Sequence, residues 1–276
     1  MTPADLYLDL LKKCLTRYMY PETLKRVDLT TGSFWKRFVK QRFGGALSRR
    51  GMSIAKEIPF DPKKRELGRD WPHEAETMIG LKRLDNLQDC IRTIIADDVP
   101  GDLIETGVWR GGASIFMRAA LMAFEDDRRT VWCADSFAGL PKPNVEMYPQ
   151  DRGMTWHTSS ALAVSEKEVI ENFRRYGMLD ERVKFLKGWF KDTLPTAPID
   201  KLSLIRLDGD MYESTLDALN NLYSKLSPGG FLIIDDFGIP EDTCRNAIAA
   251  FRRENNISEK IVDIDGFGAF WRKGSS

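Results

Sequence analysis

Two short apolar runs that each end in aspartates constrain the fold of this chain more than any other feature of its sequence. The runs cover residues 202–207 (LSLIRL) and 231–234 (FLII), and residues 213–226 between them have a helical pattern. Together they predict a β-α-β unit with two buried, parallel strands. The carboxyl ends of both strands then lie at the same edge of the sheet, where open α/β sheets bind ligands. The acids that follow the two runs are Asp208, Asp210, Asp235 and Asp236.

These four acids are expected to surround one crevice at that edge of the sheet. Ionised carboxylates without partners repel one another unless a cation or a proton intervenes. A divalent metal ion is therefore the simplest prediction for this part of the chain.

The rest of the chain repeats the alternation of strands and helices. Strands are predicted from residue 103 and over 130–133 and 183–186, helices over 74–96, 113–124, 165–176 and 241–254, and a terminal hairpin from 261–264 and 269–271. This order predicts an α/β fold with a doubly wound, mostly parallel sheet whose last strand is reversed.

The first 72 residues differ in pattern from the rest of the chain. A helix is predicted over residues 3–17, with Thr2 as its cap, whereas residues 20–69 show no persistent period and indicate a lid, an oligomer arm or a disordered loop. We therefore divide the chain into an N-terminal helix and arm, 1–72, and a main α/β domain, 73–276. The apolar helix and the long arm favour a homo-oligomer, a dimer or larger.

Composition limits the partners and the location of the protein. Lys+Arg and Asp+Glu are balanced at 41 each, so net charge gives no reason to expect nucleic acid. A basic run over residues 36–50 could contact nucleic acid or anionic lipid, but a solvated or subunit-facing surface explains it better. Four separated cysteines without CxxC spacing and the absence of a bilayer-length apolar run favour a soluble, cytoplasmic protein with reduced thiols and no membrane partner.

A glycine-rich loop precedes the helix predicted from residue 113. Gly107, Gly111 and Gly112 follow a strand, where small residues let backbone amides approach a ligand. The next strand ends at Asp135, at a position where nucleotide-binding sheets carry an acid that accepts hydrogen bonds from ribose hydroxyls. A glycine loop with such an acid occurs in NAD proteins and in S-adenosylmethionine (SAM) methyltransferases, and a purely structural turn would need the same glycines.

Five segments, in this order along the chain, carry a resemblance to one family. They are residues 77–84 (TMIGLKRL), 105–112 (ETGVWRGG), 135–141 (DSFAGLP), 188–193 (GWFKDT) and 208–212 (DGDMY), followed by Asp235-Asp236. The chain resembles the macrocin O-methyltransferase (TylF) family over residues 6–272, although residues 27–70 match little. The resemblance implies a Rossmann-like class I SAM-dependent methyltransferase with a seven-stranded sheet. It also implies SAM and Mg²⁺ as cofactors, and a sugar hydroxyl of a glycoside such as a macrolide or an aminocoumarin as the acceptor.

The resemblance also assigns roles to the acids. It implies Asp208, Asp235 and Asp236 as metal ligands; the alternative for Asp235 or Asp236 is that it caps a helix or binds an arginine. Asp210 is the candidate general base, and a fourth ligand or a helix cap is its alternative. His157, with an unperturbed pKa of about 6.5, could accept the proton in place of Asp210, or could be an exposed loop residue.

Further residues are implied to hold the two substrates. Thr77 and Met78 resemble a segment near the reacting methyl group and the acceptor, where His157 and Asp210 are also expected. A methionine at helical spacing is otherwise common in a core. The residues implied for SAM are Glu105, Thr106, Gly107, Val108, Trp109, Arg110, Gly111, Ser114, Asp135, Ser136, Gly188, Trp189 and Asp208.

Three alternative functions are open at this stage. A Mg-dependent catechol-type O-methyltransferase would use phenolic hydroxyls in a flat apolar slot. A non-catalytic SAM- or nucleotide-binding protein would not depend on the acids. A Rossmann dehydrogenase is disfavoured, because it has no use for the acid pair that ends the second apolar run.

Overall fold

The computed structural model describes residues 1–26, 47, 49–52, 54–239 and 241–274. Most of the basic run over residues 36–50 therefore lies outside the described residues. In the part of the chain that is described, no helix combines the length and the apolar character that crossing a bilayer requires.

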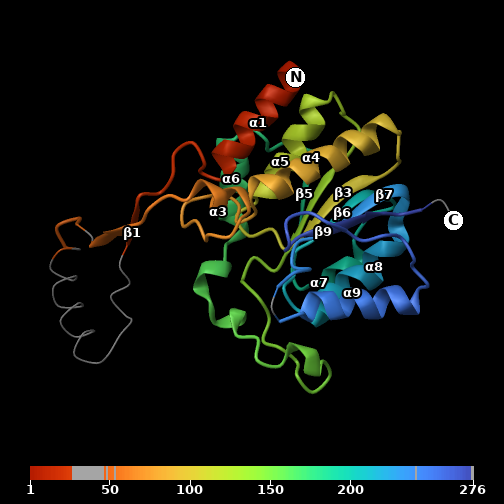
Figure 1. The fold of residues 1–276 in the computed structure, drawn as a ribbon. Coiled ribbons are helices and arrows are strands. Elements are labelled where there is room, and N and C mark those ends of the chain that lie inside the picture. Colours follow the sequence, from red (N-terminus) through yellow and green to blue (C-terminus); the bar gives the residue numbers. More distant parts are fainter. Residues whose placement is uncertain (27–46, 48, 53, 240, 275–276) are drawn as a thin grey trace.

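A seven-stranded sheet forms the centre of the molecule, in the order β5-β4-β3-β6-β7-β9-β8 (Figure 1). Neighbouring strands from β5 to β7 are parallel, whereas β9 runs antiparallel to both β7 and β8. This confirms the predicted mostly parallel sheet with its reversed last strand and terminal hairpin. The strands are β3 (Asp102–Thr106), β4 (Val131–Asp135), β5 (Val183–Lys187), β6 (Leu202–Leu207), β7 (Leu226–Ile234), β8 (Val262–Asp263) and β9 (Ala269–Arg272).

Helices cover both faces of the sheet, so its central strands are buried on both sides. All six residues of β6 are buried, as expected for an apolar run at the centre of a parallel sheet. Along each strand the side chains alternate between two cores: Leu204 packs with one helix layer and Ile205 with the other. The first layer contains α1 (Pro3–Leu15), α4 (Leu81–Ala96), α5 (Gly112–Ala123) and α6 (Glu166–Arg175), and the second contains α7 (Phe190–Thr193), α8 (Tyr212–Leu222) and α9 (Thr243–Glu254).

The helix predicted to begin at residue 74 begins only at Leu81. Residues 75–77 instead pass over the glycine loop, where the amide of Gly112 donates to the carbonyl of Glu76 at 2.9 Å. Gly80 then lies so close to residues 66–68 that a Cβ there would be 2.3 Å from the carbonyl oxygen of Glu66. These tertiary contacts override the helical period of the segment. Helix α9 likewise begins at Thr243, two residues later than predicted.

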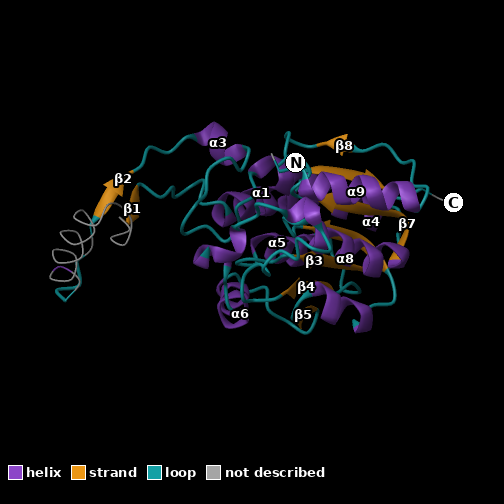
Figure 2. Ribbon diagram, turned by 90° about the horizontal axis from the view of Figure 1, so that it is seen from below, coloured by secondary structure: helices purple, strands orange, loops and turns teal. Residues whose placement is uncertain are grey.

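The N-terminal region divides into a packed helix and a projecting arm. Thr2 caps α1 through a capping box with Asp5, as predicted, and Leu8 and Leu15 are fully buried in the main core. Strands β1 (Leu24–Arg26) and β2 (Ala55–Glu57) pair antiparallel and extend away from the body (Figures 1 and 2). A short helix, α3 (Pro62–Glu66), returns the chain to α4. The domain boundary at residue 72 stays a prediction.

The long loop predicted over residues 137–160 contains three single-turn 3₁₀ helices. They are η1 (Pro149–Asp151), η2 (Trp156–Thr158) and η3 (Ser160–Leu162). The first of them contacts α8 and α9, so the loop is joined to the body near the carboxyl edge of the sheet.

Candidate active site

A cavity of about 180 Å³ opens at the carboxyl ends of β3, β4, β5 and β6. This is the edge at which the sequence predicts a ligand site. Several residues predicted for the cofactor line the cavity: Gly107, Trp109, Asp135, Ser136, Gly188, Trp189 and Asp208. Others predicted for the cofactor are not among its lining residues: Glu105, Thr106, Val108, Arg110, Gly111 and Ser114.

Gly107 allows the ends of two central strands to come together at the cavity. Its φ is +87°, and a Cβ at this position would lie 1.6 Å from the carbonyl oxygen of Asp208. The amide of Asp208 donates to the carbonyl of Thr106 at 2.8 Å, so β3 and β6 are bonded at this point. Only glycine combines this φ with the missing side-chain volume.

Asp135 holds the glycine loop in shape. Its carboxylate accepts hydrogen bonds from the amides of Val108 at 2.7 Å, Trp109 at 3.3 Å and Phe137 at 2.7 Å. Burial raises the pKa of Asp135 even though these amides favour its ionised form. The acid thus organises the backbone around the cavity, while its predicted contact with a ribose stays a prediction.

A segment from before α4 packs on the glycine loop. The guanidinium of Arg110 donates to the carbonyls of His73 at 2.5 Å and Ala75 at 3.1 Å. Gly112 has no room for a side chain, because a Cβ would lie 2.6 Å from the Cβ of Thr77. Thr77 is therefore buried beside the loop, and neither it nor Met78 is among the residues that line the cavity. Their predicted contact with the acceptor stays a prediction.

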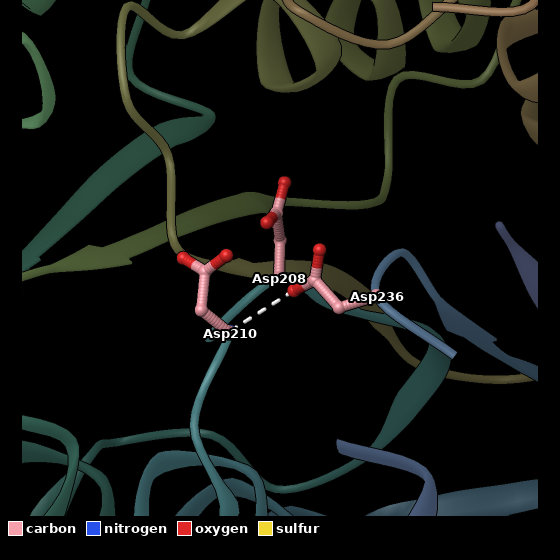
Figure 3. Close-up of side chains that lie close together, drawn as sticks. All are labelled: Asp208, Asp210 and Asp236. Atoms are coloured by element: carbon pink, nitrogen blue, oxygen red, sulfur yellow. Dashed lines mark hydrogen bonds between the residues drawn. The ribbon is translucent and has the colours of Figure 1, made fainter. Parts of the chain in front are cut away.

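Asp208, Asp210 and Asp236 form a cluster of carboxylates at the cavity. One oxygen from each lies within 4.8 Å of the others, and the amide of Asp210 donates to Asp236 at 3.0 Å (Figure 3). Within the described ranges, no lysine or arginine forms an ion pair with Asp210 or Asp236. Burial, followed by the charges of neighbouring acids, raises the pKa of Asp210 to about 7 and that of Asp236 well above its usual value. Ionisation of these acids together is therefore unfavourable unless a cation binds beside them.

Asp235 has a different environment from the other three acids. One of its oxygens accepts a hydrogen bond from Arg206 and the other from Arg83, each at 2.6 Å. Burial opposes ionisation, but the two guanidinium groups lower the pKa of Asp235 overall. Asp235 thus binds arginines, which is the alternative to a ligand role for this acid. The third carboxylate that lies close to those of Asp208 and Asp236 belongs to Asp210. The ligand role predicted for Asp235 stays a prediction.

Arg206 is the centre of a buried ionic network under the cavity. Besides Asp235, its guanidinium contacts Glu105 at 2.5 Å and Asp208 at 2.9 Å. Glu105 also accepts a hydrogen bond from the hydroxyl of Ser114. The sequence predicts both Glu105 and Ser114 as part of the cofactor site, yet both are buried. They hydrogen-bond to each other, and Glu105 also pairs with Arg206. Burial raises the pKa of Glu105 to about 7 against the opposing charge of Arg206.

The network continues through Arg83 to the C-terminal hairpin. Arg83 lies 3.1 Å from the buried carboxylate of Asp265, which also accepts the amides of Phe267 and Gly268. Neither arginine was identified from the sequence. The available signal was a charged residue inside the apolar run 202–207, since a buried arginine requires acidic partners.

The turn that carries Asp210 is strained and tightly held. Asp210 has a φ of +57°, in the left-handed region that residues other than glycine rarely adopt. Its carbonyl accepts a hydrogen bond from the hydroxyl of Thr243 at 2.6 Å, in addition to the bond from its amide to Asp236. Strain of this kind persists where surrounding contacts fix the backbone, and it is common at functional sites.

His157 does not join the acids. It lies on η2 with an exposed side chain and is not among the residues that line the cavity. Of the two candidate bases, the structure brings only Asp210 to the cluster. A role for His157 with the acceptor stays a prediction.

The sheet order, the reversed β9, the glycine loop and its acid define a class I SAM-dependent methyltransferase. The chain matches the model of the macrocin O-methyltransferase (TylF) family over residues 4–273, and it belongs to that family. It is therefore a SAM-dependent O-methyltransferase, which disfavours the dehydrogenase and binding-only alternatives.

Characterised relatives cover nearly the whole chain. It is 52% identical over 269 residues to 8-demethyl-8-(2,3-dimethoxy-alpha-L-rhamnosyl)-tetracenomycin-C 4'-O-methyltransferase of Streptomyces olivaceus, a match that covers 97% of this chain and 92% of the relative. It is 45% identical to demethyldecarbamoylnovobiocin O-methyltransferase of Streptomyces niveus, covering 98% and 94%. The solved structure of the O-methyltransferase NovP superposes with a TM-score of 0.83 at 44% identity, covering 99% of this chain and 100% of that one.

Replacing Gly107 with alanine should damage both the fold and cofactor binding, because the new Cβ would collide with the backbone of β6. Gly177 is a matched control: its φ is +68°, but no atom lies within 4 Å of the added Cβ. Gly177→Ala should cost only the left-handed strain, about 1–2 kcal/mol. Urea unfolding and calorimetric titration with S-adenosylhomocysteine would measure both variants, and equal effects would contradict the proposed clash.

Replacing Arg206 with methionine should lower the free energy of unfolding by about 3–5 kcal/mol, because two buried acids, Glu105 and Asp235, and the half-buried Asp208 lose their shared counter-charge. The loss should be smaller at about pH 5 than at about pH 8, since protonation of the acids removes the uncompensated charge. Arg128→Met is the control: it breaks an exposed pair with Asp98 and should change stability by about 0–1 kcal/mol. A pH-independent loss in Arg206→Met would argue against the electrostatic explanation.

Proposed function

We propose that this enzyme methylates a hydroxyl of a (deoxy)sugar carried by a glycosylated natural product, in the biosynthesis of an antibiotic. The observation that carries the proposal is the cluster of Asp208, Asp210 and Asp236 at the edge of the cofactor cavity, in which Arg206 pairs with Asp208 while Asp210 and Asp236 have no arginine or lysine partner among the described residues. Such a cluster can hold a cation beside a hydroxyl that is to be activated.

The names of the relatives support the acceptor class. One is a 4'-O-methyltransferase of a rhamnosyl-tetracenomycin, and another is a mycinamicin III 3''-O-methyltransferase of Micromonospora griseorubida, 44% identical over 277 residues. The cavity itself also supports a glycoside over a catechol. A flat catechol would favour an apolar slot. The lining of this cavity instead includes the polar side chains Lys142, Asn144, Lys191, Glu213 and Asp217.

The donor set of the acidic cluster fits Mg²⁺, which prefers carboxylate oxygens. We propose Asp208 and Asp236 as ligands, with Asp235 held ionised behind them by two arginines and able to contribute through its remaining lone pairs. When bound, Mg²⁺ would lower the pKa of the acceptor hydroxyl and orient it. SAM supplies an electrophilic methyl group to that hydroxyl.

We assign acceptance of the hydroxyl proton to Asp210. Among the clustered acids, Asp210 and Asp208 also line the cavity, and Arg206 contacts only Asp208. The carboxylate of Asp210 is thus available to the acceptor while its backbone is fixed by Thr243. A base must be within hydrogen-bond reach of the proton it removes, and this placement supports Asp210 over the exposed His157.

Two further predictions belong with this proposal. A homo-oligomer is supported by exposed apolar residues on α1, Leu6, Tyr7 and Leu10, opposite its buried face. A reducing, cytoplasmic location is supported by four free cysteines, three of them buried. Both stay predictions.

The acceptor class can be tested by supplying labelled SAM with a deoxysugar glycoside or with a catechol. We expect the glycoside to be preferred by at least roughly tenfold in kcat/KM, because polar groups that line a binding site discriminate against acceptors that leave them unpaired. Glycosides that differ in the position of the free hydroxyl would then identify the methylated oxygen. Transfer to the catechol alone would overturn the proposed acceptor.

The roles of the acids can be separated by removing the metal and by three Asp→Asn variants. EDTA should abolish turnover and added Mg²⁺ should restore it, while S-adenosylhomocysteine still binds the treated enzyme. Asp236→Asn should weaken Mg²⁺ binding in a calorimetric titration, whereas Asp210→Asn should retain the cation and lose roughly 10²–10⁴-fold in kcat. Asp127→Asn, at an exposed position away from the cavity, is the control. Loss of the cation in Asp210→Asn would make Asp210 a ligand instead of the base.

A further inference from the structure

Asp151 is fully buried although it belongs to the long loop between β4 and α6. A buried carboxylate requires partners that replace its hydration. Among the described residues, no lysine or arginine pairs with it, so its hydrogen bonds must come from elsewhere. It lies on η1, which contacts both α8 and α9.

The partners of Asp151 are the first amides of α8. Its two oxygens accept hydrogen bonds from the amide of Tyr212 at 2.7 Å and from that of Glu213 at 3.1 Å. The residue at the N-cap position of this helix, Met211, offers no side-chain cap. Asp151 therefore caps α8 from a segment about 60 residues away in the sequence, with its negative charge at the positive end of the helix.

The helix end that Asp151 caps follows directly from the turn of Asp210. Asp210 is two residues before Tyr212 and has the left-handed backbone described above. Three contacts fix this turn from different elements: the Asp236 carboxylate, the Thr243 hydroxyl and the Asp151 cap. Loss of the cap would free the C-terminal side of the turn.

The loop that carries Asp151 also forms one wall of the cavity. Residues 139–142 before η1 and Leu162 after it line the cavity. The ring of Tyr148 packs on that of Tyr212 with centroids 6.0 Å apart, and Met154 is buried. Residues 148–154, of which Asp151 and Met154 are buried, are thus joined to α8 next to the acidic cluster.

We propose that Asp151 is a positioning residue, which couples the cavity wall formed by the loop to the placement of the Asp210 carboxylate. The inference rests on the role proposed for Asp210. It assigns to Asp151 no contact with SAM or with the acceptor. According to this proposal, the Asp210 carboxylate is correctly placed only when the loop contacts α8 through Asp151. The loop and the turn that carries Asp210 are therefore ordered together.

The test compares Asp151→Ala and Asp151→Ser with a matched variant in the full-length enzyme. Asp126 is the comparison: it is a buried loop aspartate between α5 and the start of β4 that accepts two backbone amides, from Arg128 and Arg129, and, unlike Asp151, it also pairs with the guanidinium of Arg129. It lies at the edge of the sheet opposite the cavity. Asp126→Asn should therefore lower the melting temperature without changing the kinetics.

Asp151→Ala should lower kcat by roughly tenfold or more and raise the acceptor KM, because small displacements of a catalytic group cost large factors in rate. The affinity for S-adenosylhomocysteine should stay within about twofold, since Asp151 is not among the cavity residues. Asp151→Ser keeps a short capping oxygen and should recover part of the lost kcat. Hydrogen exchange should speed up in both residues 148–154 and the first turn of α8.

Kinetics of Asp151→Ala that match those of Asp126→Asn would overturn the proposal, as would unchanged exchange in the first turn of α8. Hydrogen exchange reports the coupling without any acceptor, so it also separates the two proposals. Faster exchange in Asp151→Ala together with a fully active Asp210→Asn would keep the structural coupling and refute the role of Asp210.

Discussion

A single buried guanidinium on the central strand supports the arrangement of the whole site. Arg206 contacts Glu105, Asp208 and Asp235, which come from the ends of three adjacent strands. Those strand ends could not carry three acids so close together without a shared counter-charge. Through Asp235 the network reaches Arg83, and from there the C-terminal hairpin, so the glycine loop, the acidic cluster and the reversed strand are connected by charge as well as by hydrogen bonds.

The roles of the acids at the ends of β6 and β7 depend on their ion-pair partners and not on their positions along the chain. Asp235 and Asp236 are neighbours in sequence, yet one has two arginines and the other has none among the described residues. The two guanidinium groups therefore keep Asp235 ionised in the protein interior, whereas burial and the charges of Asp210 and Asp208, with which Asp236 forms a cluster, raise the pKa of Asp236. A cation bound by this cluster would complete a charge balance that the protein leaves open beside its cofactor cavity.

Segments that are distant in sequence meet at this edge of the sheet through close contacts, some of which leave no space for a side chain. Residues 75–77 lie on Gly112, the end of β6 lies on Gly107, and Asp151 caps α8. The cavity is consequently built from a rigid sheet edge and a loop that is attached to it at a few points.

The sequence by itself determined the mostly parallel sheet with its reversed last strand and the edge at which the acids lie, because apolar runs and turn residues are properties of contiguous segments, and its local motifs carried the resemblance to the family. It also predicted that Asp208, Asp210, Asp235 and Asp236 surround one crevice, with Asp208, Asp235 and Asp236 implied as the metal ligands. Only the tertiary structure decided which acids are neutralised and which are not. Arg83 reaches Asp235 across 152 residues and Asp151 reaches Tyr212 across 61, and helix α4 lacks the predicted residues 74–80, about two turns, because that segment packs on the glycine loop. The partner of a buried charge depends on packing between remote segments, and no local pattern encodes that packing.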